Sequence, residues 1–279
     1  MGLICGSGLF AFSILERMSP DGPPLLDLHN IQVCRGTRVV LDAFNLQIQS
    51  GEHVAILGPN GCGKSTLIKT ITRECYPMIG PDSSMKILGE ETWNVFDLRP
   101  LLGIVSNDLM GWCTGEALGR DVVLSGFFSS NDVYPNHLVT PEMAATADAA
   151  LAQLDISHLA ERPVQEMSSG EARRVLIARA LVHQPKALLF DEPSNSLDLF
   201  AKKMLRQTMS QLARSGIGIV LVTHDLSDVI PEIERVLLMS KGRIVADGKK
   251  PDILQSGALS KVFGLNVEVE KRDGYYHLW

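Results

Sequence analysis

The chain has 279 residues, of which 45% are hydrophobic and 21% charged, an ordinary globular balance that can bury a sizeable core. Its net charge of −6 argues against nucleic acid as a partner, because phosphate backbones favour clustered Lys and Arg. The odd set of five cysteines has no CxxC pair and no accompanying His cluster, which indicates reduced thiols in a cytosolic protein: Cys5, Cys34, Cys62, Cys75 and Cys113.

The N-terminal segment 1–24 is predicted to be a poorly ordered leader, with translation from an upstream start codon as the alternative. Residues 1–15 carry no charged side chain, yet this stretch is shorter than the roughly 20 apolar residues that a spanning helix needs. It also lacks the basic start of a signal peptide. Pro and Gly then cluster at 20–24, so we expect a folded domain over 25–265. No other segment approaches transmembrane length, and we expect any membrane passage to belong to another chain.

The sequence predicts that the first part of this domain forms several short strands, then a buried strand that leads into a helix. Partly alternating apolar residues at 26–33, 39–41 and 44–48 indicate an antiparallel β subdomain. A buried strand at 53–57 then runs into a glycine-rich loop, and a helix is predicted from Lys64 to about Thr72.

A helical insertion is predicted next, over about 108–170, with helices at 116–126 and 142–154. Alternation then resumes with helices at 170–182, 198–214 and 226–231 and strands at 187–190, 217–222 and 235–240. Alternating strands and helices predict an α/β fold with a mostly parallel central sheet. The tail 266–279, with a turn at Asp273-Gly274, is predicted to be a closing β-hairpin.

The glycine-rich loop fits the phosphate-binding pattern G-x4-G-K-[ST]. Glycines let the backbone N–H groups surround phosphate oxygens, and the following helix adds partial positive charge. Lys64 is predicted to reach the β- and γ-phosphates and Ser65 to ligate Mg²⁺. The predicted nucleotide contacts are Gly58, Pro59, Asn60, Gly61, Cys62, Gly63, Lys64, Ser65 and Thr66.

Two carboxylates end the apolar strand at 187–190. Asp191 is placed to hold Mg²⁺, and Glu192 to orient or deprotonate the attacking water. By itself an apolar run followed by Asp-Glu is usually just the end of a strand. Its pairing with the phosphate loop favours the catalytic interpretation.

A further segment, "MSSGE" at 167–171, also has two interpretations. Ser168 with Glu171 forms a good capping box, so this could be an ordinary helix start. However, the phosphate loop, "MSSGE", "LLFDEPSNSLD" and "VLVTHD" follow one another in the order typical of ABC ATPases. The chain resembles that family over about residues 25–250, and the resemblance implies a P-loop NTPase fold that binds ATP and Mg²⁺.

The resemblance also implies roles for individual residues. Ser168 and Gly170 resemble the signature residues that contact the γ-phosphate bound by the opposite subunit of a dimer. Asp198 resembles the D-loop residue at the dimer interface, and His224 the switch histidine that senses the γ-phosphate. A head-to-tail dimer places a signature helix N-terminus on each ATP.

Several positions depart from the family pattern. Asn107 stands where a Gln usually offers an oxygen to Mg²⁺ or its water. Arg35 stands where an aromatic usually stacks on adenine, and since a guanidinium can also stack on a base we expect weaker discrimination between ATP and GTP. In the signature segment, Ser169 replaces the usual Gly and Glu171 the usual Gln, and neither change removes a needed hydrogen-bond donor. Cys62 lies near a helix N-terminus, where a thiol pKa tends to fall, so we expect it to be reactive.

Three functions are compatible with these motifs. The leading hypothesis is the ATP-hydrolysing subunit of an ABC transporter, peripheral on the inner face of the membrane and bound to permease subunits. The segment 121–128 resembles a branch linked with molybdate or iron handling. The alternatives are a soluble ABC-type ATPase in cluster assembly or regulation, and a nucleotide-binding regulator without turnover, against which Glu192 speaks.

Overall fold

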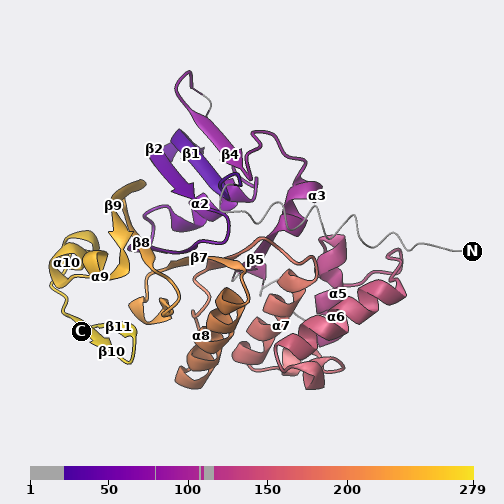
Figure 1. The fold of residues 1–279 in the computed structure, drawn as a ribbon. Coiled ribbons are helices and arrows are strands. Elements are labelled where there is room, and N and C mark those ends of the chain that lie inside the picture. The colour runs from indigo at the N-terminus through magenta and orange to yellow at the C-terminus, as the bar shows by residue number, and fades with distance from the viewer. Residues whose placement is uncertain (1–21, 79, 107, 110–115) are drawn as a thin grey trace, which may run out of the picture.

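The computed structural model describes residues 22–78, 80–106, 108–109 and 116–279. Asn107, Cys5, Cys113 and most of the predicted leader lie outside these residues. Figure 1 shows a large central sheet, a small sheet above it, helices between and below these two, and a short hairpin near the C-terminus.

A six-stranded sheet forms the centre of the molecule, in the order β5-β6-β7-β3-β8-β9. The first five strands are parallel, and β9 is antiparallel to β8. Strands β3, β6 and β7 are almost wholly buried, as expected for a parallel sheet covered on both faces. The strands are β3 (His53–Leu57), β5 (Leu102–Ser106), β6 (Ala187–Asp191), β7 (Gly218–Thr223), β8 (Arg235–Ser240) and β9 (Arg243–Lys249).

Each face of this sheet has its own hydrophobic core, because successive strand residues point to opposite faces. Val54 and Ile56 face one core, which α2 (Lys64–Ile71) fills together with a small antiparallel sheet of order β2-β1-β4. That sheet comprises β1 (Leu26–Arg35), β2 (Arg38–Ile48) and β4 (Ser84–Ile87). Ala55 and Leu57 face the other core, which is covered by α5 (Gly119–Leu124), α6 (Pro141–Gln153), α7 (Ser169–Leu181) and α8 (Leu199–Arg214).

The C-terminal part adds a hairpin with its turn at Asp273-Gly274. Strand β11 (Tyr275–Leu278) packs against η5 (Leu226–Asp228), a 3-10 turn that follows β7, and Tyr276 is buried there. The remaining elements are α3 (Val95–Leu98), η1 (Arg99–Leu101), η2 (Ser125–Phe128), η3 (Ser157–Leu159), η4 (Val164–Glu166), η5 (Leu226–Asp228), α9 (Lys250–Ile253), α10 (Ser256–Phe263), β10 (Val269–Arg272) and β11 (Tyr275–Leu278).

The structure corrects several predicted elements. The helix predicted at 226–231 is wrong: only the turn η5 forms, because Val229 is extended and Pro231 disfavours helical backbone in the residue before it. The strands predicted at 39–41 and 44–48 are one strand, β2, with Ala43 at a positive φ of 46° inside it. The helix predicted at 116–126 spans only Gly119–Leu124. Elements α3, β4, β9, α9 and α10 were not predicted.

Candidate nucleotide site

The phosphate loop joins the carboxyl end of β3 to α2. Gly61 and Gly63 have φ angles of 77° and 112°, a region that L side chains rarely adopt. No side chain caps the N-terminus of α2, so its first N–H groups remain for an anion. Asn60, Gly61 and Ser65 are exposed along the loop, whereas Thr66 is buried. The loop therefore presents backbone donors and the Ser65 hydroxyl outward.

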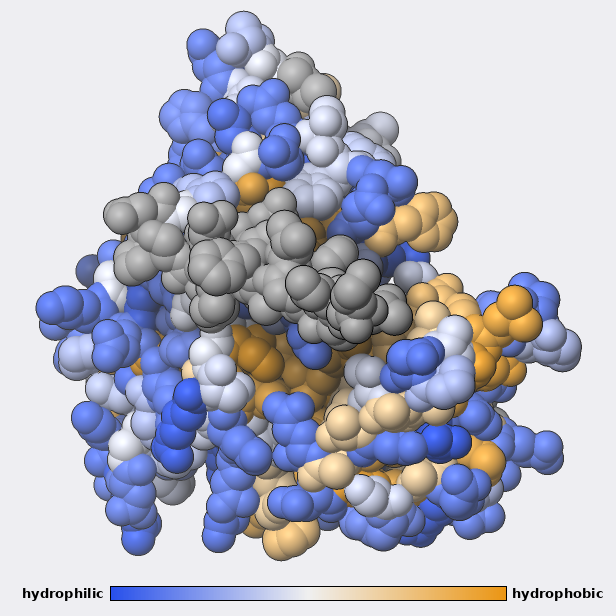
Figure 2. Space-filling view, turned by 45° about the vertical axis from the view of Figure 1, so that its right-hand side comes forward, coloured by the Kyte–Doolittle hydropathy of each residue, from blue (hydrophilic) through white to orange (hydrophobic). Residues whose placement is uncertain are grey.

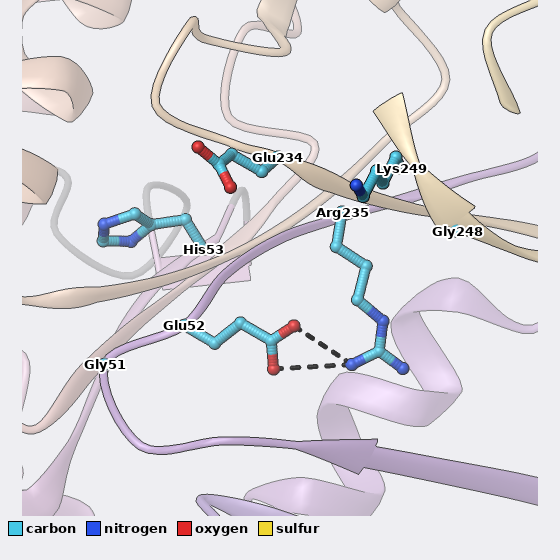
Figure 3. A pocket seen from close by; sticks show the side chains of 7 residues that line it. All are labelled: Gly51, Glu52, His53, Glu234, Arg235, Gly248 and Lys249. Atoms are coloured by element: carbon cyan, nitrogen blue, oxygen red, sulfur yellow. Dashed lines mark hydrogen bonds and ion pairs between the residues drawn. The ribbon is translucent and has the colours of Figure 1, made fainter. Parts of the chain in front are cut away.

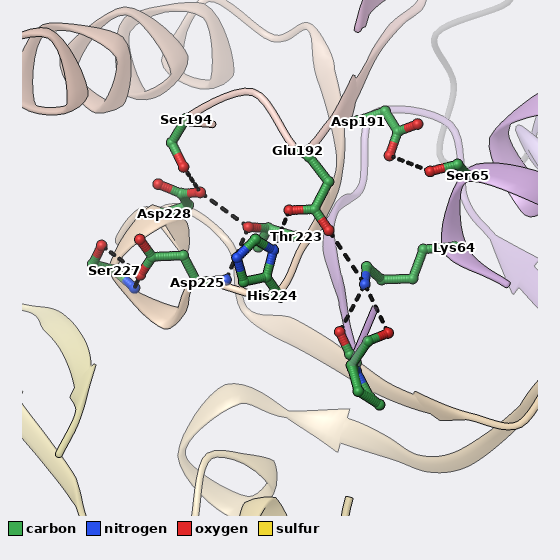
Figure 4. A network of polar contacts seen from close by, with 12 residues as sticks. Lys64, Ser65, Asp191, Glu192, Ser194, Thr223, His224, Asp225, Ser227 and Asp228 are labelled. Carbon is green, nitrogen blue, oxygen red and sulfur yellow. Dashed lines mark hydrogen bonds and ion pairs between the residues drawn. The ribbon is translucent and has the colours of Figure 1, made fainter. Parts of the chain in front are cut away.

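Lys64 lies beneath this loop and is only 5% exposed. Its Nζ donates to the carbonyl oxygens of Gly58 at 2.7 Å and Pro59 at 3.1 Å. It also forms an ion pair with Glu192 Oε1 at 3.2 Å. The ammonium group is thus held at the junction of the phosphate loop and the carboxyl end of β6 (Figure 4).

Ser65 and Asp191, which are 126 positions apart, meet beside the loop. The Ser65 hydroxyl donates to Asp191 Oδ1 at 3.2 Å. Burial raises the pKa of Asp191, and the Ser65 hydrogen bond opposes this shift. A hydroxyl and a carboxylate are hard oxygen donors of the type that Mg²⁺ prefers. These two side chains therefore fit a magnesium ion.

Glu192 brings the third group to the same place. Its backbone has φ +49°, and its N–H donates to the carbonyl of Val222 at 2.8 Å, which fixes the turn after β6 against β7. The carboxylate contacts Lys64 through Oε1, while Oε2 accepts from His224 Nδ1 at 2.5 Å. The carboxyl ends of β3, β6 and β7 thus place a lysine, two carboxylates and a histidine around one point (Figure 4).

The "MSSGE" segment forms the N-terminus of α7. The capping box is confirmed: the Ser168 side chain accepts from the Glu171 N–H, and Glu171 accepts from the Ser168 N–H. A Cβ on Gly170 would lie 2.7 Å from Cβ of Ala201 in α8. Asp198 caps α8 by accepting from the Ala201 N–H at 2.7 Å. Gly170 of α7 therefore lies against the first turn of α8, which Asp198 caps.

Arg35 lies at the tip of the β1–β2 hairpin, opposite Arg38, and is exposed. Its positive charge lies close enough to Lys69 of α2 to oppose the rise that Asp108 causes in the pKa of that lysine. The guanidinium is therefore free of the core, on the same side as the helix that follows the phosphate loop.

The prediction that Cys62 has a lowered pKa is wrong. Its side chain is only 4% exposed, and burial raises the pKa of the thiol more than the nearby Lys64 charge lowers it. Proximity to a helix N-terminus favours a thiolate only where the sulfur is not desolvated.

A separate cleft of about 460 Å³ lies at the amino end of β3, lined by Glu52, His53, Glu234 and Arg235 with neighbouring backbone (Figure 3). The Arg235–Glu52 ion pair spans it, and burial lowers the pKa of His53. The phosphate loop leaves the carboxyl end of β3, so this cleft is not part of the nucleotide site.

Comparison with known proteins identifies the family. The family model described as "ABC transporter" matches residues 41–195 of the chain. The chain belongs to the ABC transporter family. It is an ATP-binding, ATP-hydrolysing subunit of an ABC transporter, and the predicted α/β fold class is confirmed.

Relatives of this ABC ATPase differ in length and in named cargo. It is 32% identical to the hemin import ATP-binding protein HmuV of Hahella chejuensis, with 86% of this chain and 92% of that protein covered. It is 30% identical to the spermidine/putrescine import ATP-binding protein PotA of Haemophilus influenzae; that match covers 86% of this chain but 62% of the relative. The structure of cbiO1 from Clostridium perfringens, part of the CbiONQ transporter complex, aligns with a TM-score of 0.72 and 26% identity, covering 86% and 94% of the two chains.

Sequence reasoning missed three polar side chains of this ABC ATPase. The buried Asp228 accepts hydrogen bonds from Ser194 and Thr223, which lie beside Glu192 and His224 in the chain. The sequence carries no signal for this cluster, because its members come from two separate loops.

Among the helices within the described residues, none has the length and apolarity needed to cross a bilayer.

Proposed function

We propose that this ABC ATPase binds Mg-ATP on the phosphate loop, with the residues predicted from the sequence in their predicted roles. Supporting this is one observation: Lys64, Ser65, Asp191, Glu192 and His224 converge at the carboxyl ends of β3, β6 and β7. The backbone N–H groups at the start of α2 and the Lys64 ammonium bind the β- and γ-phosphates. To do so, Lys64 exchanges its contacts with the loop carbonyls and Glu192 for phosphate oxygens.

The two acidic residues have different tasks: Asp191 binds the ion and Glu192 the attacking water. Ser65 and Asp191 hold Mg²⁺, with Asn107 as the further oxygen donor proposed from the sequence. Bound Mg²⁺ neutralises charge that develops on the phosphates. Glu192 orients the water and accepts its proton, and it is released for this task once Lys64 turns to the phosphates. His224, already in contact with Glu192, senses the γ-phosphate.

Turnover requires a second copy of the chain in this proposal. Ser168 and Gly170 lie at the capped N-terminus of α7, whose N–H groups and dipole can act on the γ-phosphate of the partner's ATP. Leu199 and Phe200, next to Asp198, are 87% and 72% exposed, so the start of α8 presents an apolar surface to a partner. We infer a homodimer that ATP closes and hydrolysis opens.

The adenine is proposed to stack on Arg35 at the exposed tip of the β1–β2 hairpin. A planar guanidinium stacks on any purine without reading its edge. We therefore expect similar affinities for ATP and GTP, in contrast to a site with a stacked aromatic ring.

The proposed membrane partner is a permease that binds the helical side of the subunit. A cleft of about 500 Å³ runs between α2, β5, η2 and α7, and Asp191 is one of its lining residues. Figure 2 brings this side forward and shows apolar side chains gathered on it; Phe96 and Leu138 are 71% and 85% exposed. We therefore place the protein on the inner face of the membrane. Import is proposed because the named relatives are import proteins; the resemblance of segment 121–128 to molybdate or iron systems remains a prediction.

The test uses Lys64→Ala and Glu192→Gln in the full chain. Lys64→Ala should lower ATP affinity and abolish hydrolysis. Glu192→Gln should bind ATP with parent affinity, hydrolyse it at least about 100-fold more slowly, and elute as a dimer with Mg-ATP in light-scattering chromatography. Parent rates of hydrolysis in Glu192→Gln would refute its role. A Glu192→Gln variant that stays monomeric with ATP would refute the dimer.

A further inference from the structure

Asp228 is a fully buried carboxylate that no part of the proposed reaction uses. Its Oδ2 accepts two hydrogen bonds, from the Ser194 hydroxyl at 2.6 Å and from the Thr223 hydroxyl at 3.0 Å. Ser194 follows Glu192 by two residues, and Thr223 directly precedes His224 (Figure 4). One buried oxygen atom therefore joins the two loops that carry the proposed base and switch histidine.

Burying this carboxylate has a cost that its two hydrogen bonds only partly offset. Burial raises the pKa of Asp228, while the bonds from Ser194 and Thr223 lower it. Its other oxygen, Oδ1, is buried and meets no donor among the residues that the structure describes. A buried charged group with one unpaired oxygen contributes little to stability by itself. The geometry favours a role in holding the loops.

We propose that Asp228 is a positioning residue for ATP hydrolysis, which keeps Glu192 and His224 in mutual contact by tying the turn after β6 to the end of β7. This inference rests on the proposed roles of Glu192 and His224. Asp228 acts through Ser194 and Thr223 and does not touch the nucleotide.

The turn that carries Glu192 needs such a restraint. Glu192 has a positive φ, which costs free energy for a side chain with a Cβ and persists only where surrounding contacts impose it. The Glu192 N–H is bound to Val222 on one side of the turn, and the Ser194 hydroxyl is bound to Asp228 on the other. Without the second contact the turn can relax, and small displacements of a catalytic group lower the rate strongly.

Asp228 is itself held firmly. It ends η5, and its N–H donates to the carbonyl of Asp225 at 3.1 Å. Strand β11 packs against η5, and Lys250 donates to the carbonyl oxygens of Ile230 and Pro231 just beyond it, both at 3.0 Å. The C-terminal segment thus fixes the position from which Asp228 restrains the two loops.

The first test compares two substitutions of Asp228. Asp228→Leu has a similar shape but no acceptor, and we expect kcat to fall about 10- to 100-fold while the Kd for Mg-ATP changes less than about 2-fold. Asp228→Asn keeps an acceptor oxygen for both hydroxyls, and its kcat should stay within about 3-fold of the parent. Thr208→Val, which removes a buried hydroxyl inside α8, is the control for a purely structural loss and should leave kcat unchanged.

The second test asks whether Asp228 acts through the switch histidine. In a His224→Ala background, Asp228→Leu should lower kcat less than about 2-fold further, because the contact it supports is already lost. Full additivity of the two substitutions, or parent kcat in Asp228→Leu, would overturn the inference. If Asp228→Leu does not fold, Ser194→Ala and Thr223→Val each remove one of the two bonds, and parent kcat in both would overturn it equally.

These results separate the inference from the function on which it rests. If Glu192→Gln hydrolyses ATP at the parent rate, the proposed function fails. If Glu192→Gln is inactive and Asp228→Leu is fully active, only the positioning role of Asp228 fails.

Discussion

Gly58 opens the phosphate loop at a point where the backbone of a core strand leaves no space for a side chain. A Cβ at this position would lie 2.3 Å from the carbonyl oxygen of Met239 and 2.8 Å from Cys62 Sγ. Carbon–oxygen contacts are normally no shorter than about 3.3 Å, so Gly58→Ala requires a displacement of about 1 Å. Met239 is fully buried in β8, which cannot move easily. Overpacking of this kind costs about 1–3 kcal/mol, and we expect the upper end of that range.

The assay is urea unfolding together with titration of Mg-ATP. We expect Gly58→Ala to lower the free energy of unfolding by about 3 kcal/mol and to weaken ATP binding at least about 10-fold, because the loop that surrounds the phosphates is displaced. Gly257→Ala is the matched control: a Cβ there meets nothing within 4 Å, so stability should be unchanged or slightly higher. A loss below about 0.5 kcal/mol with parent ATP affinity would refute the close-packing argument.

Two further predictions concern buried titratable groups. Because burial raises the pKa of the Cys62 thiol, alkylation of the folded protein should modify the partly exposed Cys34 and Cys75 first, as peptide mass spectrometry would show; faster labelling of Cys62 would contradict this. The pKa of Asp228 is raised by burial, so the native state binds its proton more tightly than the unfolded state, and stability falls as pH rises above the ordinary carboxyl pKa of 3.8. Asp228→Asn does not titrate, so its thermal midpoint relative to the parent should rise as pH rises above 3.8; a difference that stays constant with pH would contradict this coupling between protonation and stability.

Much of the nucleotide site could be predicted because its parts are local. The phosphate loop is one continuous segment between a strand and a helix, and glycines at positive φ are needed wherever that loop forms. The capping box of Ser168 and Glu171 likewise depends on a spacing of three residues. Short-range chemistry of this kind is written directly in the sequence.

The predictions failed where contacts with distant parts of the chain determine the local structure or the pKa. The thiol of Cys62 follows its burial under β2 and β8 rather than the helix N-terminus beside it. The segment after β7 has helical composition, but Pro231 and the packing of β11 leave only the turn η5. Strand β9 could not be assigned because its alternating burial depends on an edge position beside β8.

The sequence by itself determined that a phosphate loop, two carboxylates and a histidine end the strands of a parallel sheet, since each motif needs only its immediate neighbours. Only the tertiary structure decided that Ser65 meets Asp191, that Lys64 and His224 share Glu192, and that Asp228 ties the loops together. The physical reason is that strand order places β3 beside β7 and β7 beside β6, and this order depends on how the whole chain packs.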